Sequence, residues 1–309
     1  MATVLERIKV IWISHKHADH HLGTIGLLSH RARLCPQAAP VLVIAPHRVL
    51  HFLKRYAEIA HADSMCFDMM DIKDTCIQHH HEASRNLKQL DEILAKRCAG
   101  IVSLRSVSVV HCSGSFGVSL SMSSSAHSNG AITVDRPRND DGDGIVKLVY
   151  SGDTRPCDGL VELGMDADIL VHEATFDDDL SEDAVDKKHS TTSEALHIGR
   201  RMNAKQILLT HFSQRYPKIA KLASHSCIAF DLLRVRLHEL ERLESHIPLL
   251  SNLLSDEAKQ DILNINTSLE STDNMTSISN AKELLASSDE TTASPDISDA
   301  VAAFAVQER

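Results

Sequence analysis

The sequence predicts an α/β protein in which two β-sheets pack together and helices flank them. Short apolar runs rich in β-branched residues alternate with segments of helical periodicity along most of the 309 residues. Hydrophobic residues make up 43% of the chain, which is enough for a globular core, and aromatic residues make up only 4%. Histidine or aspartate stands at the end of several strand-like runs. We therefore expect a layered sandwich whose polar site lies at the strand ends.

The first hundred residues contain two predicted strands and three predicted helices. The chain is expected to run from its start straight into a strand at residues 10–13, without a signal peptide. A second compact apolar strand is expected at residues 41–44. Apolar spacing predicts helices over residues 24–33, 47–60 and 86–98, whereas residues 61–85 are expected to be irregular.

The pattern turns to strands after residue 106. Strands are expected at residues 107–110, 117–122, 131–134, 145–150, 168–171 and 206–209. Residues 137–144 are rich in Asp and Gly and predict a turn. Helices are expected over residues 157–163, 192–202 and 229–244.

Past about residue 254 the composition changes to Ser, Thr, Asp, Asn and Glu. Residues 255–309 contain 11 acidic and 3 basic residues, a balance of −8, and are predicted to be a disordered acidic tail. The chain as a whole carries a net charge of −10, so the remaining 254 residues carry about −2 and can still present a local basic face. The domain prediction is a catalytic domain over residues 1–254 and this tail.

The cysteine pattern and the hydropathy indicate an intracellular protein that does not enter a membrane. Seven cysteines are scattered without a Cys-x-x-Cys pair, which indicates reduced thiols rather than a disulfide framework. We interpret Cys112 and Cys157 as packing residues. No segment reaches 18 consecutive apolar residues, so no transmembrane helix is expected.

A cluster of histidines directly follows the first predicted strand. Residues 14–23 read Ser-His-Lys-His-Ala-Asp-His-His-Leu-Gly. Strand side chains alternate with period two, so His15 and His17 face the same side, and Asp19 and His20 follow on the turn. Imidazoles and carboxylates suit zinc and similar divalent ions, and this segment offers two ligands to each of two neighbouring ions. The alternative is a polar loop that happens to be rich in histidine.

Four further residues lie at predicted strand or helix ends. His111, Asp153 and His211 each end a strand, and His189 opens a helix rich in Ser and Thr. Taken singly, a histidine at a strand end is more often a satisfied core or rim residue, but four such residues after the first cluster favour a metal site. The run His79-His80-His81 is interpreted as a solvated loop, because three adjacent residues cannot share one face.

The first cluster resembles the His-x-His-x-Asp-His signature of the metallo-β-lactamase fold, and its extended form resembles ribonuclease Z, the tRNA 3′-processing endonuclease. The similarity runs from about residue 5 to about residue 250. The further matching motifs are Ser-Gly-Asp-Thr-Arg-Pro-Cys at 151–157, His-Glu-Ala-Thr-Phe at 172–176, His-Ser-Thr at 189–191, Leu-Thr-His-Phe-Ser-Gln-Arg-Tyr at 209–216 and Ala-Phe-Asp at 229–231. The resemblance implies the αββα sandwich of that fold.

The resemblance also implies roles for the residues. One zinc would be held by His15, His17 and His111, and a second by Asp19, His20 and His211, with Asp153 bridging the two. Together the ions would activate water for attack on phosphorus. Asp19 would orient the nucleophile, His189 would protonate the leaving oxygen and Glu173 would position His189. Arg215 is expected to touch a substrate phosphate.

The sequence departs from the family at its beginning. Ribonuclease Z normally has a strand-rich unit before the metal loop, with a Pro-x-Lys-x-Arg-Asn substrate loop. The pairs Arg85-Asn86 and Arg138-Asn139 lack the preceding Pro and Lys. We therefore expect the chain to correspond to the carboxy-terminal part of a long-form enzyme, with its amino-terminal strands missing. Pairing with an amino-terminal half, or with a second copy, would then be expected.

Three functional hypotheses follow. The first is a zinc-dependent endoribonuclease that removes the 3′ trailer from precursor tRNA. The second is a remnant that binds metal but cannot grip tRNA, and the third is a general metallo-phosphodiesterase. Because phosphate contacts dominate nucleic-acid affinity, we expect the isolated chain to hydrolyse a small phosphodiester better than precursor tRNA.

Overall fold

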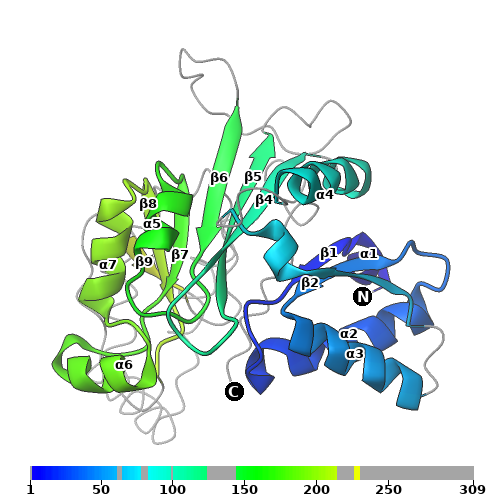
Figure 1. Cartoon of the computed structure of the whole chain (residues 1–309), viewed down its shortest axis with the longest axis horizontal. Helices are drawn as coiled ribbons and strands as arrows, with labels where there is room; N and C mark the ends of the chain where they lie inside the picture. Colours follow the sequence, from blue (N-terminus) through cyan, green and yellow to red (C-terminus); the bar gives the residue numbers. More distant parts are fainter. Residues whose placement is uncertain are drawn as a thin grey trace, which may run out of the picture.

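Two β-sheets form the centre of the protein, and helices lie on their outer sides (Figure 1). The computed structural model describes residues 2–60, 65–77, 83–98, 100–123, 144–213 and 226–229. No helix in these ranges is both long and apolar enough to cross a membrane. The elements in chain order are α1 (Ala2–Arg7), β1 (Val10–Trp12), α2 (Ala18–Leu34), β2 (Val41–Ala45), α3 (His47–Ile59), β3 (Phe67–Asp71), η1 (Ile72–Thr75), α4 (Ala83–Arg97), β4 (Ile101–Ser108), β5 (Phe116–Ser123), β6 (Ile145–Tyr150), α5 (Asp158–Gly164), β7 (Ile169–Glu173), η2 (Asp178–Leu180), α6 (Ser181–Lys187), α7 (Thr192–Arg201), β8 (Gln206–Thr210) and β9 (Ser226–Ile228).

The first sheet is parallel, with strand order β1-β2-β3. Every side chain of β2 is buried, which requires cover on both faces. Its alternating side chains divide between two cores: Leu42 and Ile44 point toward the second sheet, whereas Val41 and Val43 pack with residues of α2 and α3. This sheet is therefore sandwiched between a helix layer and the second sheet.

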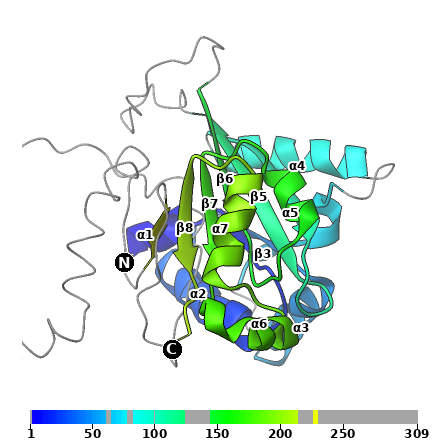
Figure 2. The same cartoon turned by 90° about the vertical axis from the view of Figure 1, so that its left-hand side faces the viewer.

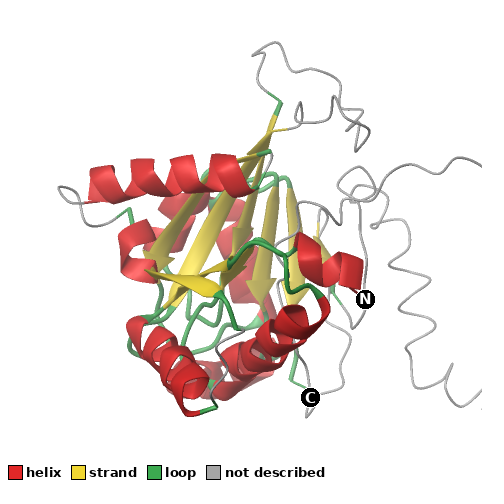
Figure 3. Cartoon of the chain, turned by 90° about the vertical axis from the view of Figure 1, so that its right-hand side faces the viewer, coloured by secondary structure: helices red, strands yellow, loops and turns green. Residues whose placement is uncertain are grey.

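The second sheet has the order β4-β5-β6-β7-β8-β9 within the described residues. Strands β4 to β6 are antiparallel, and β6 to β9 are parallel. Phe116 and Val118 of β5 share a core with Ile44 of the first sheet. On the outer side, Leu170 of β7 packs with residues of α5 and α7, and Figure 2 shows these helices in front of the sheet. The layers therefore run helix, sheet, sheet, helix, and Figure 3 shows the strands in the middle with helices around them, so the predicted α/β sandwich is confirmed.

Most predicted elements agree with the structure to within a few residues, but several predictions are wrong. The segment at residues 61–85 is not irregular: it contains β3, η1 and the start of α4. β3 reads Phe-Asp-Met-Met-Asp and has little β-branched content, so it forms through pairing with β2 rather than through propensity. Helix α2 begins at Ala18 instead of residue 24, and β4 begins at Ile101 instead of residue 107.

Four further short elements were not predicted: α1, η2, α6 and β9. Helix α1 replaces the expected direct entry into the first strand. The expected strand at residues 131–134, the turn before Gly144, the triple-histidine loop, the tail at residues 255–309 and all but the first residue of the helix at 229–244 lie outside the described residues.

A hydrogen bond between backbone groups connects the two sheets close to the carboxyl end of β1. The amide of Phe116, which opens β5, donates to the carbonyl of Ser14 at 3.1 Å. Just before it, the amide of Ile13 donates to the carbonyl of Ile44 at 2.9 Å. The loop after β1 is therefore fixed to both sheets, and the histidines that follow emerge from a rigid support.

Candidate metal centre

The seven predicted metal-binding residues lie together at the strand ends. His15 and His17 stand in the loop after β1, and Asp19 and His20 lie in the first turn of α2, not on a turn before a later helix. The remaining members follow β4, β6 and β8, and they are His111, Asp153 and His211. Parallel strands bring their carboxyl ends to one edge of a sheet, which explains why residues so far apart in sequence meet here.

The Asp153 carboxylate occupies the middle of this group. Its Oδ2 lies 3.6 Å from Nε2 of His15, 3.4 Å from Nε2 of His20 and 3.8 Å from Nε2 of His111. Its other oxygen, Oδ1, lies 3.8 Å from Nε2 of His211. One buried carboxylate therefore faces both predicted sets of histidines, which is the position that a bridging ligand requires.

The two predicted sets also form two spatial groups. Nδ1 of His17 lies 3.0 Å from Nε2 of His15 and 3.2 Å from Nε2 of His111. The potential ligand atoms of Asp19, His20 and His211 lie within 4.8 Å of one another. Cys112 also reaches the first group within that distance, and its thiol lies 3.2 Å from Oγ of Ser115.

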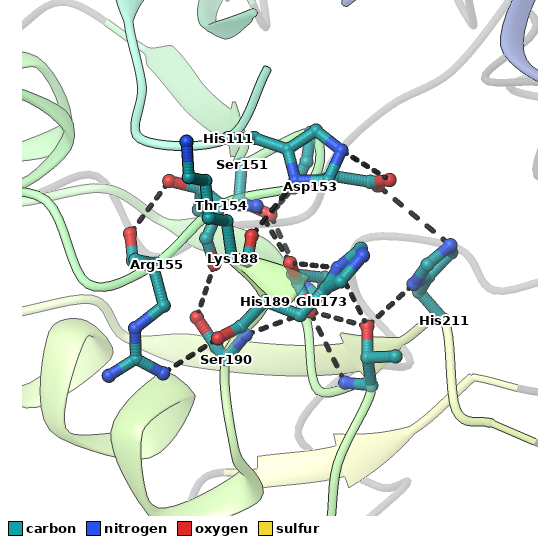
Figure 4. Close-up of polar contacts among 12 residues, drawn as sticks. His111, Ser151, Asp153, Thr154, Arg155, Glu173, Lys188, His189, Ser190 and His211 are labelled. Carbon is teal, nitrogen blue, oxygen red and sulfur yellow. Dashed lines mark hydrogen bonds and ion pairs between the residues drawn. The ribbon is translucent and has the colours of Figure 1, made fainter. Parts of the chain in front are cut away.

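Three imidazoles use Nδ1 to contact a neighbouring protein group, and this fixes their rings (Figure 4 draws some of these contacts). Nδ1 of His111 donates to the carbonyl of Lys188 at 2.9 Å, and Nδ1 of His211 lies 2.7 Å from Oγ1 of Thr175. Nδ1 of His15 lies 2.9 Å from Oγ of Ser14. In each case Nε2 remains directed at Asp153. Metal-bound histidines typically use their second nitrogen in this way, so the residues fit a divalent ion.

The protonation of His15, His111 and Asp153 suits metal binding, whereas for His20 burial is outweighed by the combined hydrogen bond and charge of Asp153, which raise its pKa. Burial, with the positive charge of nearby His20, lowers the pKa of His15 to about 2, so this imidazole is neutral. Burial also lowers the pKa of His111. For Asp153 burial acts in the opposite direction, but the hydrogen bond from His20 and the charge of His211 hold its pKa well below the ordinary value. Neutral imidazoles and an ionised carboxylate are the forms that bind zinc.

Glu173, at the end of β7, organises the other side of the site. Its Oε1 lies 2.9 Å from Nδ1 of His189 and accepts a hydrogen bond from the amide of Thr154 at 2.7 Å. Its Oε2 accepts from the hydroxyl of Thr175 at 2.5 Å and from the amide of Ser190 at 3.1 Å. This carboxylate is fully buried and fully hydrogen-bonded, so it can hold the His189 ring in one orientation.

The loop that carries His189 is held by contacts that the sequence analysis did not anticipate. Arg155 donates to the carbonyl of His189 at 2.7 Å and forms a two-pronged ion pair with Glu194, at 2.7 and 2.5 Å. Glu194 is also the third residue of α7 and forms a capping box with Thr191. The Ser/Thr-x-x-Glu pattern was visible in the sequence, whereas the contact from Arg155 depends on β6 lying close to this loop.

Two site residues have left-handed backbones. Gly152, next to Asp153, has φ +58°, and a Cβ there would lie 2.7 Å from the carbonyl oxygen of Phe116. His211 has φ +63°, an uncommon conformation for a residue with a side chain. Uncommon conformations held in this way are typical of functional sites. Arg215, the predicted substrate contact, lies outside the described residues.

Comparison with known proteins agrees with this geometry. The profile of the β-lactamase superfamily domain matches residues 2–212. Ribonuclease Z, mitochondrial, from Drosophila melanogaster is 34% identical over 264 residues, covering 83% of this chain and 31% of that protein. Zinc phosphodiesterase ELAC protein 2 from Rattus norvegicus is 37% identical over 270 residues, covering 83% of this chain and 29% of that protein. The chain thus spans about a third of the length of these relatives.

Solved structures show the same relationship. A long form RNase Z from yeast has a TM-score of 0.66 and 26% identity, covering 81% of this chain and 35% of that one. The short form of human tRNase Z has a TM-score of 0.52 at 23% identity, covering 75% of this chain and 80% of that one, and shares the fold. The sandwich, the ligand-bearing strand ends and the match over residues 2–212 together show that the chain belongs to the β-lactamase superfamily, with the metallo-β-lactamase fold.

Proposed function

We propose that the chain is the catalytic part of a zinc-dependent endoribonuclease that removes the 3′ trailer from precursor tRNA. The observation that carries this proposal is the position of Asp153 between two groups of candidate ligands, next to the buried Glu173–His189 pair. The ribonuclease Z relatives support the choice of substrate.

The proposed centre holds two zinc ions. His15, His17 and His111 would hold one, Asp19, His20 and His211 the other, and Asp153 would contact both. Two such ions supply Lewis acidity, which lowers the pKa of water and offsets the negative charge of the phosphoryl oxygens.

The remaining groups position and move protons. Asp19 is partly exposed at the mouth of the centre, with a side-chain exposure of 45%, so it can accept a hydrogen bond from the attacking water. As the phosphorus–oxygen bond breaks, the leaving ribose oxygen takes a proton from Nε2 of His189. Burial alone would lower the pKa of His189, but the hydrogen bond to Glu173 and the negative charges of Glu173, Asp153 and Asp19 together raise it, so its charged, proton-donating form is favoured. Arg215 would contact a substrate phosphate.

The test is a side-by-side assay of the zinc-loaded chain on precursor tRNA and on bis(p-nitrophenyl) phosphate, with end mapping of the RNA products. Cleavage at the junction of acceptor stem and trailer supports the proposal. The net charge of −10 favours a second candidate, a general metallo-phosphodiesterase. That candidate would be established if the chain turns over the small diester but does not cleave precursor tRNA, even when an amino-terminal half of a long-form enzyme is added in trans. The same addition tests the identity of the partner chain. Cleavage of precursor tRNA only after the amino-terminal half is added would make that half the partner, rather than a second copy of this chain.

We also propose that residues 1–254 form the catalytic domain and that the acidic tail at 255–309 is dispensable. The tail offers few large apolar side chains to bury, so its removal should leave the melting temperature of the domain unchanged. A drop of several degrees on truncation after Leu254 would show that the tail packs on the domain.

A further inference from the structure

The exposed side of α3 carries basic and aromatic side chains in one stripe. Side chains four positions apart on a helix are neighbours, and two such rows lie side by side on the exposed half of α3. The first row is His47, His51 and Arg55, the second is Arg48, Phe52 and Tyr56, and all six residues are exposed. Val49, Leu50 and Leu53 lie on the opposite face, in the core. The first acidic residue of the helix is Glu58, which pairs with Arg55 at 2.8 Å on the surface. An exposed pair of this kind is weak and does not prevent the guanidinium from binding another anion.

This stripe lies next to the metal centre. β1 and β2 are parallel neighbours, so the loop with His15 and the amino-terminal end of α3 emerge at the same edge of the sheet. The ring of Phe52 contacts that of His21 at a centroid distance of 5.2 Å, and His21 directly follows the site residue His20. Figure 1 shows α2 and α3 side by side below the first sheet.

The chemistry of the stripe fits single-stranded RNA. Proteins that bind single strands combine positive groups along the backbone with aromatic rings on which bases stack. Arg48 and Arg55 supply positive charge two turns apart, while Phe52 and Tyr56 remain 36% and 39% exposed. The rings of His47 and His51 lie nearly parallel, at 13°, and add two further flat surfaces.

We propose that the stripe on α3 binds the single-stranded trailer as it leaves the metal centre. The proposal rests on the proposed function for the identity of the RNA, but the binding itself does not depend on cleavage. It assigns Arg48 and Arg55 to phosphates and the aromatic side chains to bases. Longer trailers should therefore bind more tightly than trailers of one or two nucleotides.

The experiment compares the full chain with R48E/R55E. Affinity for a labelled single-stranded oligoribonucleotide is measured by fluorescence anisotropy at several salt concentrations. At low salt, the affinity of the variant for the oligoribonucleotide should be lower by about tenfold or more. The slope of log K against log salt should become shallower by about 1.4, because two phosphate contacts are removed. K88E/K96E on α4 is the matched control, because it makes the same change of charge away from the metal centre. Helix α4 packs on Ile101 and Leu104, at the end of β4 that is far from His111. The control should bind as the parent does.

Two further readouts separate the possible failures. Turnover of bis(p-nitrophenyl) phosphate should be the same in parent, variant and control, which shows that each chain is folded and active. With precursor tRNA, R48E/R55E should lose the advantage of a long trailer over a short one. Three results would show that the inference is wrong. The parent does not bind single-stranded RNA, the variant binds it as tightly as the parent does, or the variant loses the same affinity for long and for short trailers. If the stripe binds RNA but no precursor is cleaved, the inference stands and the proposed function fails.

Discussion

Nδ1 of His189 lies 2.9 Å from the Glu173 carboxylate, which is itself fully buried. This contact leaves Nε2 of His189 available to the site, where the ring stands 4.7 Å from that of His111 and 5.4 Å from that of His211. The imidazole is therefore held beside the predicted ligands His111 and His211 by a buried carboxylate. Such a pair suits a proton donor that acts on a substrate bound at the metals.

The first prediction concerns this proton donor. His189→Ala should keep its zinc while cleavage slows by roughly 10²–10⁴. Because Glu173 helps to raise the pKa of His189, E173Q should lower that pKa. A general acid works only while protonated, so the high-pH limb of the rate profile should move to lower pH in E173Q. Elemental analysis and pH–rate profiles on precursor tRNA, whose leaving ribose oxygen needs a proton, measure both effects. Loss of zinc from His189→Ala would make His189 a ligand instead.

The second prediction concerns the ion pair between Arg155 and Glu194, which are 18% and 30% exposed. Removing one partner leaves the other charge half-buried without compensation, whereas removing both does not. R155M and E194Q should each lower the melting temperature and the turnover number, and R155M/E194Q should recover part of both losses. Thermal melts and turnover of the four proteins form a double-mutant cycle. Additive losses would show that the pair does not position the His189 loop.

Much of this centre could be predicted because its residues are dense in sequence and stand next to apolar runs. His15 and His17 follow a strand whose β-branched pattern is unmistakable, and Asp153 and His211 each follow another. The contacts that orient these rings could not be predicted in the same way. The carbonyl of Lys188 has no signature in the sequence, and Thr175 contacts both Glu173 and His211 only because β7 and β8 are neighbours.

Among the strands and helices, too, some could be predicted from their own sequence and others depend on a neighbouring element. Strand β2 was predicted from its own sequence, because a strand buried on both faces must be apolar throughout. Strand β3 has exposed and polar positions and is defined by its partner β2, so its own composition does not reveal it. The start of α2 was missed because Asp19, His20 and His21 in its first turn do not follow an apolar helical period. Asp19 and His20 belong to the polar cluster at the strand ends and not to the core.

A third prediction follows from the central position of Asp153. Asp153→Ala should lose most of both zinc ions, since its two oxygens face both ligand groups. His17→Ala should lose mainly one, since His17 contacts only His15 and His111 among the ligands. Zinc per chain, measured on protein whose folding is verified by circular dichroism, distinguishes the two variants. Retention of two ions by Asp153→Ala would contradict the bridging role.

The last prediction concerns the backbone beside Asp153. Gly152→Ala forces a side chain into a left-handed conformation, which costs about 1–3 kcal/mol. It also places the new Cβ 2.7 Å from the Phe116 carbonyl oxygen and 3.1 Å from Cβ of Ser14, so the loop before His15 must move. We expect a lower melting temperature and a loss of zinc affinity in the same variant. Gly26→Ala in α2 is the matched control: nothing lies within 4 Å of its new Cβ, and alanine favours a helix by about 0.8–1.0 kcal/mol over glycine. This control should bind zinc normally and melt at the same or a higher temperature. If Gly152→Ala behaves like Gly26→Ala, the close approach of β5, Ser14 and Gly152 does not position the metal centre.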